Sequence, residues 1–431
     1  MTEVSARRRQ EIIDALRRGA VPVNGLDVLA VGLDRFVTAV DEDLDRIAGA
    51  GSVFKAIRGE YGAGKTFFTR WLAERAKQRG FATAEVQISE TETPLHRMET
   101  VYRRLVEQLT TEQFTPSALR PILDGWIFAL EEDVLRLGIV AEDDAAGLDS
   151  AVAALLEQRL AGISRTTPAF AAALRGYRAA SAGADQAAAD GLAAWLGGQP
   201  TVAATARRAA GVKGELDHFG ALSFLQGLLT VLRDGGHPGL LVVLDEVETL
   251  QRVRSDARDK ALNALRQLID DVYSGRFPGL FLVITGTPAF FDGTQGVQRL
   301  APLAQRLATD FGPDPRWDNP RAVQVRLPGF TVDALVELGA KVRSLYDSPR
   351  VTTVDDAYLR GLAQAVTGRL GGQVGVAPRI YLKKLVADIL DRVDQFDDWD
   401  PRMHYTLTVK SAELTEVERN YASADDVDLP L

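Results

Sequence analysis

The sequence contains no cysteine and only four histidines in 431 residues. Without cysteine there can be no disulfides, cysteine nucleophiles, thiolate zinc sites or iron–sulfur clusters. No apolar run is long enough to span a bilayer, and no apolar segment follows the arginines at positions 7–9. The histidines lie too far apart in the sequence to form a local metal-ligand motif: His96, His218, His237 and His404. These absences predict a soluble cytoplasmic protein that does not associate with membranes.

Positive charge is also in deficit, because 50 lysines and arginines stand against 59 aspartates and glutamates, which gives a formal net charge of −9. A general attraction to nucleic acid is therefore not expected, and any DNA contact would depend on a local basic patch. The hydrophobic fraction of 46% is ordinary for a globular protein. The length predicts two or three packed units.

The most informative stretch is residues 59–66, which match G-x-x-x-x-G-K-[ST] at every fixed position. Residues 53–58 predict a strand before it and residues 67–74 a helix after it, which is the context of a phosphate-binding P-loop. Glycines let backbone N–H groups approach a polyphosphate, and the helix points its positive end at the anion. Lys65 is expected to contact the β and γ phosphates of ATP and Thr66 to bind Mg²⁺, unless the match is a chance glycine-rich turn. The expected nucleotide-binding residues are Gly59, Glu60, Tyr61, Gly62, Ala63, Gly64, Lys65 and Thr66.

A second motif follows much later, where five apolar residues at 240–244 precede Asp245 and Glu246. This Walker B pattern is typical of a buried parallel strand that carries carboxylates to the phosphate site. Asp245 is expected to hold Mg²⁺ through its water shell, and Glu246 to orient and deprotonate the attacking water. The alternative is a solvated acidic turn. A strand expected at 80–88, between the two motifs, favours the additional-strand class of P-loop ATPases.

The segments between and after these motifs predict mostly helices. The Ser/Thr/Glu cluster at 89–94 is interpreted as the N-terminal cap of a helix over about 95–110. Residues 111–216 show helical alanine and leucine spacing without a strand signal, which predicts an all-helical insertion for partner contact or for structural elaboration. Helices are also expected at 217–233 and 255–273. The second begins among basic residues whose favoured interpretation is a solvated face rather than a nucleic-acid contact: Arg252, Arg254, Arg258 and Lys260.

A further buried strand at 279–287 ends in hydroxyl residues, and with it the chain resembles the AAA+ ATPases, especially the initiator-like branch that includes origin recognition proteins. The resemblance implies an α/β fold: an AAA+ P-loop ATPase core with a parallel sheet flanked by helices, a large helical insertion and a C-terminal helical lid. It also implies that Thr285 or Thr287 is sensor 1, the polar residue that holds the attacking water.

Later stretches extend the AAA+ resemblance. Residues 300–307 are similar to the segment that carries the arginine finger, residues 325–331 to the entry to the lid, and residues 376–382 to the sensor 2 helix. The resemblance implies that Arg306, with Arg299 as its rival, stabilises the γ phosphate bound to a neighbouring subunit. It also implies that Arg379 contacts the nucleotide of its own chain. An arginine's fork of donors suits a phosphate, although each could instead be a surface residue.

The expected domain organisation follows from these segments. Lid helices are expected at 332–345, 357–366 and 377–393, an extra strand at 404–409 and a frayed acidic end from Asp425. No room is left after residue 395 for a winged-helix DNA module, which puts duplex recognition in doubt. The expected divisions are 1–110 for the N-terminal helices and first half of the core, 111–216 for the insertion, 217–330 for the second half of the core, 331–395 for the lid and 396–431 for a C-terminal extension.

A closer resemblance is to the BREX phage-defence ATP-binding proteins of the BrxC/BrxD type, particularly the shorter BrxD-like members. It is specific in residues 58–66, 85–96 and 244–250, and extends from near Arg7 to about Arg419. The family implies an ATPase within a bacterial or archaeal defence system that acts on phage DNA, often beside a helicase.

Three functional hypotheses remain from the sequence. The first is an ATP-hydrolysing AAA+ motor or switch that forms a homo-oligomer and acts on DNA or with a helicase. The second is a slowly hydrolysing module that recruits defence effectors. The third, a P-loop kinase with a small-molecule acceptor, is disfavoured by the Asp245-Glu246 pair and by the lid arginine.

Overall fold

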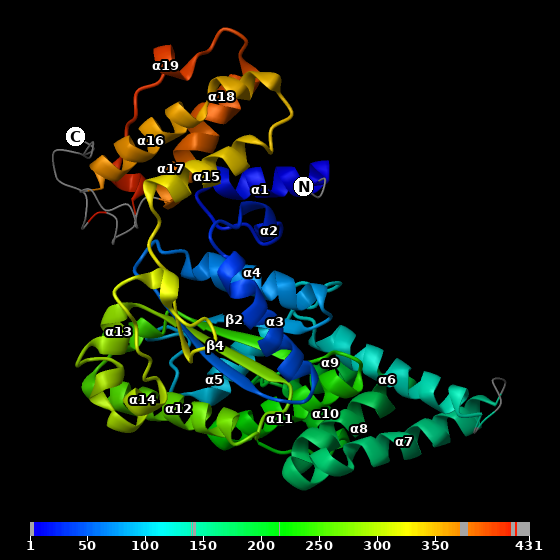
Figure 1. The fold of residues 1–431 in the computed structure, drawn as a ribbon. Helices are drawn as coiled ribbons and strands as arrows, with labels where there is room; N and C mark the ends of the chain where they lie inside the picture. The colour runs from blue at the N-terminus through cyan, green and yellow to red at the C-terminus, as the bar shows by residue number, and fades with distance from the viewer. Residues whose placement is uncertain are drawn as a thin grey trace. The chain divides into compact units, whose positions relative to one another are not determined.

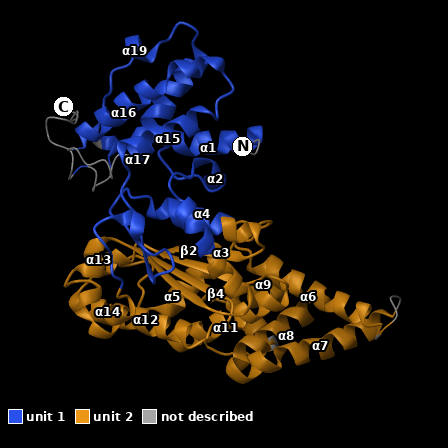
Figure 2. Ribbon diagram, in the orientation of Figure 1, with its two compact units in different colours: residues 1–40, 57–74, 309–431 blue, residues 41–56, 75–308 orange. Residues whose placement is uncertain are grey.

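The computed structural model describes residues 4–138, 140, 144–214, 216–370, 378–414 and 419. The chain divides into two compact units, coloured separately in Figure 2. Unit 1 comprises residues 1–40, 57–74 and 309–431, and unit 2 comprises residues 41–56 and 75–308. Each unit is thus assembled from segments that are distant in the sequence. Figure 1 shows the helices and strands, with labels where there is room.

Five strands form one parallel sheet in the order β2-β3-β4-β1-β5. All residues of β1, β3 and β4 are buried, as expected for parallel strands with helices on both faces. The α/β class predicted from the sequence is therefore confirmed. The strands are β1 (Val53–Arg58), β2 (Ala82–Gln87), β3 (Leu240–Asp245), β4 (Leu280–Gly286) and β5 (Gln324–Arg326).

The sheet order shows which strand separates the P-loop strand from the acidic strand. In the sequence β2 lies between β1 and β3, and we interpreted it as the additional strand. In the sheet β2 lies at the edge, and β4 occupies the place between β1 and β3. Because crossover connections allow a chain to skip a position and return, chain order alone does not give the order of strands.

The start of β3 is tightly packed within unit 2. Gly239 precedes the strand, and a Cβ on it would lie 2.4 Å from the carbonyl oxygen of Gly279 and 2.6 Å from Cγ2 of Ile47. Its own carbonyl accepts a 3.1 Å hydrogen bond from the amide of Ala82, while Leu240 donates to the Gly279 carbonyl at 2.8 Å. Only a residue without a side chain fits this entry to the sheet.

The helices of unit 2 include the segment predicted as an insertion. Between residues 111 and 216 the described residues contain helices and no strand, with α6 packed on α7, α7 on α8 and α8 on α9. Phe224 of α11 joins these helices to the rest of the unit, since its ring lies 5.0 Å from that of Phe170 and 5.1 Å from that of Trp195. The helical elements are α5 (Met98–Glu107), α6 (Leu119–Arg136), α7 (Ala145–Thr166), α8 (Pro168–Ala182), α9 (Gln186–Leu196), α10 (Ala204–Ala209), α11 (His218–Asp234), η1 (Val247–Gln251), α12 (Ser255–Tyr273), α13 (Pro288–Asp292), η2 (Val297–Arg299) and α14 (Ala301–Arg306).

Unit 1 contains a helical bundle with its own apolar core. Residues of α1, α15, α16 and the helix that starts at Pro378 form one buried cluster. Arg17 of α1 binds both carboxylate oxygens of Asp391, at 2.7 and 3.0 Å. Two helices contribute residues to both units, α3 (Asp34–Ala48) and α4 (Lys65–Gln78). The other helical elements of unit 1 are α1 (Ala6–Arg17), α2 (Leu26–Leu29), η3 (Pro315–Trp317), α15 (Val332–Arg343), η4 (Pro349–Thr353), α16 (Asp356–Arg369), α17 (Pro378–Lys383), η6 (Lys384–Leu390), α18 (Asp391–Gln395), α19 (Pro401–His404) and η7 (Ser411–Glu413).

The C-terminal part departs from two expectations. The helix expected at 377–393 contains a π-helical turn, η6, between α17 and α18, and Ala377 lies outside the described residues. The strand expected at 404–409 is wrong, because His404 ends α19 and residues 405–409 pair with no strand. Val409 is nevertheless buried in the core of the helical bundle, so the apolar pattern at 404–409 reflects packing against these helices. The segment from Asp425 also lies outside the described residues.

Candidate functional site

One candidate site is the P-loop of unit 1, between β1 and α4. Gly62 and Gly64 have positive φ angles of 79° and 86°, in the left-handed region that favours glycine. A Cβ on Gly59 would lie 3.0 Å from Cβ of Ala63, so this turn also leaves little space for a side chain. The loop ends at the first turn of α4, where backbone N–H groups have no helical acceptors.

Lys65 is the first residue of α4, and its side chain folds back over the loop. Its Nζ donates to the carbonyl oxygens of Gly59 at 2.9 Å and Glu60 at 3.3 Å, and lies 5.0 Å from the ring centroid of Tyr61. The residue is 8% exposed. The ammonium group therefore stays over the concave side of the loop, where a phosphate would be bound.

These features fit a nucleoside triphosphate. Three glycines lie where a Cβ would strain or crowd the loop. The N-terminus of α4 favours an anion, and the buried ammonium group of Lys65 lies over the same loop. Magnesium usually takes one or two protein ligands and completes its shell with phosphate oxygens and water. Thr66 and a single acidic residue would therefore suffice. Among the described residues, no group of three or more acidic or histidine side chains is placed to hold a metal by itself.

A separate candidate site is the acidic turn of unit 2, at the carboxyl end of β3. Asp245 is 6% exposed, and its Oδ1 accepts hydrogen bonds from the hydroxyl of Thr285 and, at 3.1 Å, from the amide of Glu246. The same amide contacts Oγ1 of Thr285 at 3.0 Å. Since Thr285 is fully buried in β4, the neighbouring strand fixes the orientation of the carboxylate.

Glu246 has an unusual backbone conformation, with φ 58° and ψ 43°. A non-glycine residue in this left-handed region costs about 1–3 kcal/mol and persists only where its surroundings fix it. Its Oε2 accepts a 2.8 Å hydrogen bond from Nε2 of Gln87, the last residue of β2. The sequence analysis missed Gln87. The parallel register pairs it with Asp245, so the end of β2 was the place to search for a partner of the acidic pair.

The two candidates for sensor 1 have different surroundings. Thr285 lies within β4 and contacts Asp245, whereas Thr287 follows the strand and is the N-cap of α13. The Thr287 hydroxyl does not cap that helix, and its residue is 5% exposed. Thr285 thus orients the Asp245 carboxylate, while Thr287 lies one residue beyond the end of β4.

The two candidate finger arginines are both ion-paired with α12. Arg299 binds both oxygens of Asp259 and donates to Oγ of Ser255 at 2.7 Å, and its hydrogen bond lowers the pKa of the Asp259 carboxyl. Arg306 binds both oxygens of Asp270 and the carbonyl of Pro302. Arg299 also lines a surface groove.

Arg379, the candidate sensor 2 residue, lies in the first turn of α17. Its Nη2 donates to the carbonyl oxygen of Glu413, and its Nη1 lies 3.3 Å from the position that a Cβ on Gly19 would take. Lys383 and Lys384 bind the carboxylate of the same glutamate at 3.3 and 2.9 Å. The arginine therefore belongs to a basic cluster that the segment after α19 covers.

Residues 89–94, which follow β2, do not cap the next helix as expected. Helix α5 begins at Met98, and its N-cap residue, Arg97, makes no side-chain cap. The hydroxyl of Ser89 instead accepts hydrogen bonds from the amides of Glu92 and Thr93, at 3.1 and 3.0 Å. Ser89 therefore closes a local turn, because a serine hydroxyl bonds readily to amides a few residues ahead.

A parallel sheet that leads into a glycine cradle at a helix N-terminus defines a P-loop nucleotide-binding protein of the α/β class. The chain belongs to the family described as BREX system ATP-binding protein BrxC/D, whose model matches residues 4–409. A search of curated proteins found no match. None of the described helices is both long and apolar enough to cross a membrane.

Proposed function

We propose that this BREX-family ATP-binding protein is an AAA+ ATPase that hydrolyses ATP to ADP and phosphate. Lys65 and the P-loop amides hold the phosphates, and Thr66 with Asp245 holds Mg²⁺. Glu246 orients the attacking water and accepts its proton, while Thr285 and Thr287 are the candidates for the sensor that contacts the water. Bound Mg²⁺ would neutralise charge that develops on the phosphates.

The observation that carries this proposal is the acidic turn. A buried strand presents Asp245, a buried threonine fixes its carboxylate, and the next carboxylate, on a residue with a left-handed backbone, lies beside Gln87 at the end of β2. Left-handed non-glycine residues, which cost about 1–3 kcal/mol, cluster at active sites and switch regions. Parallel strands bring their carboxyl ends to one edge of a sheet, and β1 and β3 belong to the same sheet. The topology therefore supports joint action of the P-loop and the acidic turn.

Phosphate release tests the proposal. Glu246→Gln keeps the size and hydrogen bonding of the side chain but removes the base, so turnover should fall about 10²-fold or more while ATP affinity changes little. Glu92→Gln is the matched control, because its side chain is 77% exposed and makes one long contact at 3.7 Å. Equal turnover in wild type and Glu246→Gln would remove Glu246 from its role.

We further propose that the active form is a homo-oligomer in which Arg306 or Arg299 completes a neighbour's site and Arg379 contacts the nucleotide of its own chain. Mixing Glu246→Gln subunits with Arg306→Ala or Arg299→Ala subunits tests the idea. If the arginine acts across the subunit boundary, a site that keeps its Glu246 can receive an arginine from a neighbouring Glu246→Gln subunit. Such a site has an intact set of residues, and turnover should reappear. Mixtures that stay inactive would contradict a trans arginine.

A second candidate function is a slowly hydrolysing switch that recruits defence effectors, instead of a motor that moves on DNA or with a helicase partner. The ion pairs around α12 favour the switch, since Arg299 and Arg306 bind carboxylates of the same chain. Sizing the protein with ATP, with ADP and with DNA while phosphate release is measured would separate the two. Strong stimulation by DNA supports the motor, and dependence on protein concentration without a DNA effect supports the switch.

A further inference from the structure

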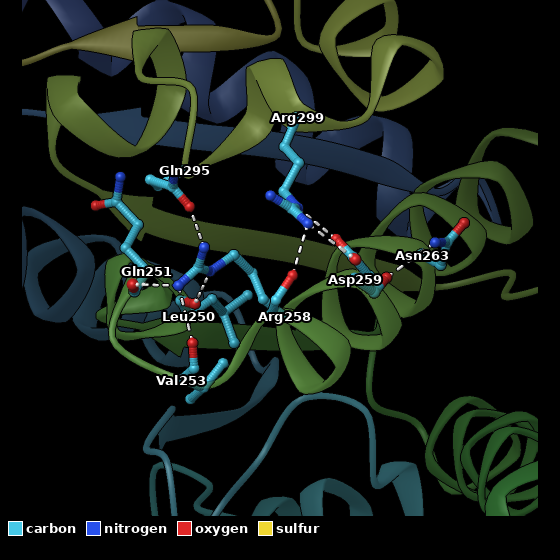
Figure 3. A network of polar contacts seen from close by, with 9 residues as sticks. Leu250, Gln251, Val253, Arg258, Asp259, Asn263, Gln295 and Arg299 are labelled. Carbon is cyan, nitrogen blue, oxygen red and sulfur yellow. Dashed lines mark hydrogen bonds and ion pairs between the residues drawn. The ribbon is translucent and has the colours of Figure 1, made fainter.

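Arg258 lies in the first turn of α12, and its guanidinium group donates to four acceptors (Figure 3). Nε contacts the carbonyl oxygen of Leu250 at 3.2 Å, and Nη2 contacts those of Gln251 and Val253, each at 2.8 Å. Nη1 donates to Oε1 of Gln295. The three carbonyls belong to the end of η1 and the turn after it, where the last carbonyls of a helix have no partners within that helix. Arg258 supplies those partners.

The segment that Arg258 holds begins directly after the proposed catalytic base. Glu246 is the N-cap of η1, and Oγ1 of Thr249 donates back to its carbonyl oxygen at 2.9 Å. On the other side, the amide of Glu246 contacts Asp245 and Thr285. The left-handed conformation of Glu246 is therefore fixed from β3 and β4 on one side and by η1 on the other. Arg258 anchors the far end of η1.

The same guanidinium also joins η1 to the loop that follows α13. This loop, residues 293–299 with η2 at its end, carries Gln295. Gln251 separately connects η1 to α13 itself, by donating from Nε2 to the carbonyl of Ala289 at 3.0 Å. Arg299 at the end of the loop binds Asp259 in the same turn of α12 (Figure 3). Hydrogen bonds thus connect η1, α12 and the loop.

We propose that Arg258 is a positioning residue for ATP hydrolysis: it fixes η1 and thereby holds the backbone of Glu246, from which the carboxylate reaches the attacking water. The inference rests on the proposed ATPase function. Lysine should not replace Arg258, because one ammonium group cannot reach acceptors spread over both edges of a planar fork of donors. Neither charge nor helix propensity distinguishes the two residues strongly, so a defect in the lysine variant would point to geometry.

The test compares Arg258→Gln and Arg258→Lys with Arg252→Gln, an exposed arginine at the C-cap of η1. Turnover, affinity for a fluorescent ATP analogue and thermal unfolding are measured for each. Both Arg258 variants should lose about 10- to 100-fold in kcat, since a shift of about 1 Å in a reacting group costs up to about 10²-fold. Their nucleotide Kd should change less than about twofold, because Arg258 does not belong to the P-loop. Arg252→Gln should match wild type.

A double variant separates positioning from general damage. If Arg258 acts through Glu246, then Arg258→Gln should cost nothing further in the Glu246→Gln background, because residues that act as a unit are not additive. Additive losses would overturn the proposal, as would wild-type kcat in Arg258→Gln or full activity in Arg258→Lys. If Arg258→Gln does not fold, Gln295→Ala, which removes one of the four contacts, must lower kcat at unchanged Kd or the proposal fails. Equal turnover in wild type and Glu246→Gln would instead refute the proposed role of Glu246.

Discussion

The side-chain amide of Gln87 donates a 2.8 Å hydrogen bond to the carboxylate of Glu246. The donor ends β2 and the acceptor follows β3, two strands paired in parallel register up to Gln87 and Asp245. The contact holds the proposed base toward the edge of the sheet. Any rotation of this carboxylate toward a water molecule must break or lengthen the bond.

Gln87→Ala is expected to raise basal turnover. The bond is exposed to solvent, where a hydrogen bond contributes about 0.5–1.5 kcal/mol, so its removal should release the carboxylate and raise kcat by about two- to tenfold. Phosphate release at saturating ATP measures the effect, with Gln186→Ala on the exposed surface of α9 as the control. A fall in kcat would show that Gln87 aims the base instead of restraining it.

Thr285→Val is expected to lower both stability and turnover. The change keeps the shape of a fully buried side chain but removes a hydroxyl that bonds Asp245 and the amide of Glu246. Unsatisfied buried groups cost about 1–3 kcal/mol, and a misplaced carboxylate should cut kcat at least about tenfold. Urea unfolding and phosphate release are the measurements. Thr230→Val, on an exposed face of α11, should change neither, and equal effects in both variants would contradict the assignment.

Gly64→Ala is expected to weaken ATP binding more than it weakens the fold. Space is available, since a Cβ would lie 3.5 Å from the nearest atom of Phe330, but the φ angle of 86° is unfavourable for alanine. The strain of about 1–3 kcal/mol should shift the loop amides and reduce affinity at least about tenfold. Nucleotide titration with parallel thermal unfolding tests this. Gly361→Ala, where no atom lies within 4 Å and φ is not positive, is the control, and unchanged affinity in Gly64→Ala would refute the role of that glycine.

The carboxyl of Asp41 should make stability depend on pH in the acidic range. A hydrogen bond from Arg75 lowers the pKa of Asp41 below its usual 3.8, so the folded protein holds the proton less tightly than the unfolded chain does. The stabilisation is therefore complete above about pH 4 and is lost as pH falls through the folded-state pKa. Because both side chains are about a third exposed, the contribution is about 0.5 kcal/mol. Asp41→Asn should lower the urea midpoint equally at pH 7 and 5 and less below pH 4; a constant difference at all pH values would contradict the ion pair.

The sequence was sufficient wherever a short pattern determines local geometry. Residues 59–66 gave the P-loop, and the apolar run before Asp245 gave a fully buried strand. Helix α12 spans residues 255–273 as expected, because one strong 3.6-residue period covers its whole length. These elements depend on neighbouring residues, so the local sequence is enough to predict them.

The contacts that complete the acidic turn lie far apart in the sequence. Gln87 and Glu246 are 159 positions apart in the sequence, and β4 separates β1 from β3 in the sheet although it follows both in the chain. The basic residue Arg258 was interpreted as part of a solvated face, yet it binds three backbone carbonyls. Nothing in the spacing distinguishes an arginine that turns inward from one that faces water.

Gly239 lies at the opposite end of β3 from Asp245, about 20 Å away at 3.3 Å per residue. Any larger residue there would collide with the Gly279 carbonyl and with Ile47, so that the strand or its neighbours would have to shift. Such a shift would carry the carboxylate out of register with Thr285. An inherited or laboratory change at position 239 would thus present as a hydrolysis defect, although no atom of that residue comes near the chemistry.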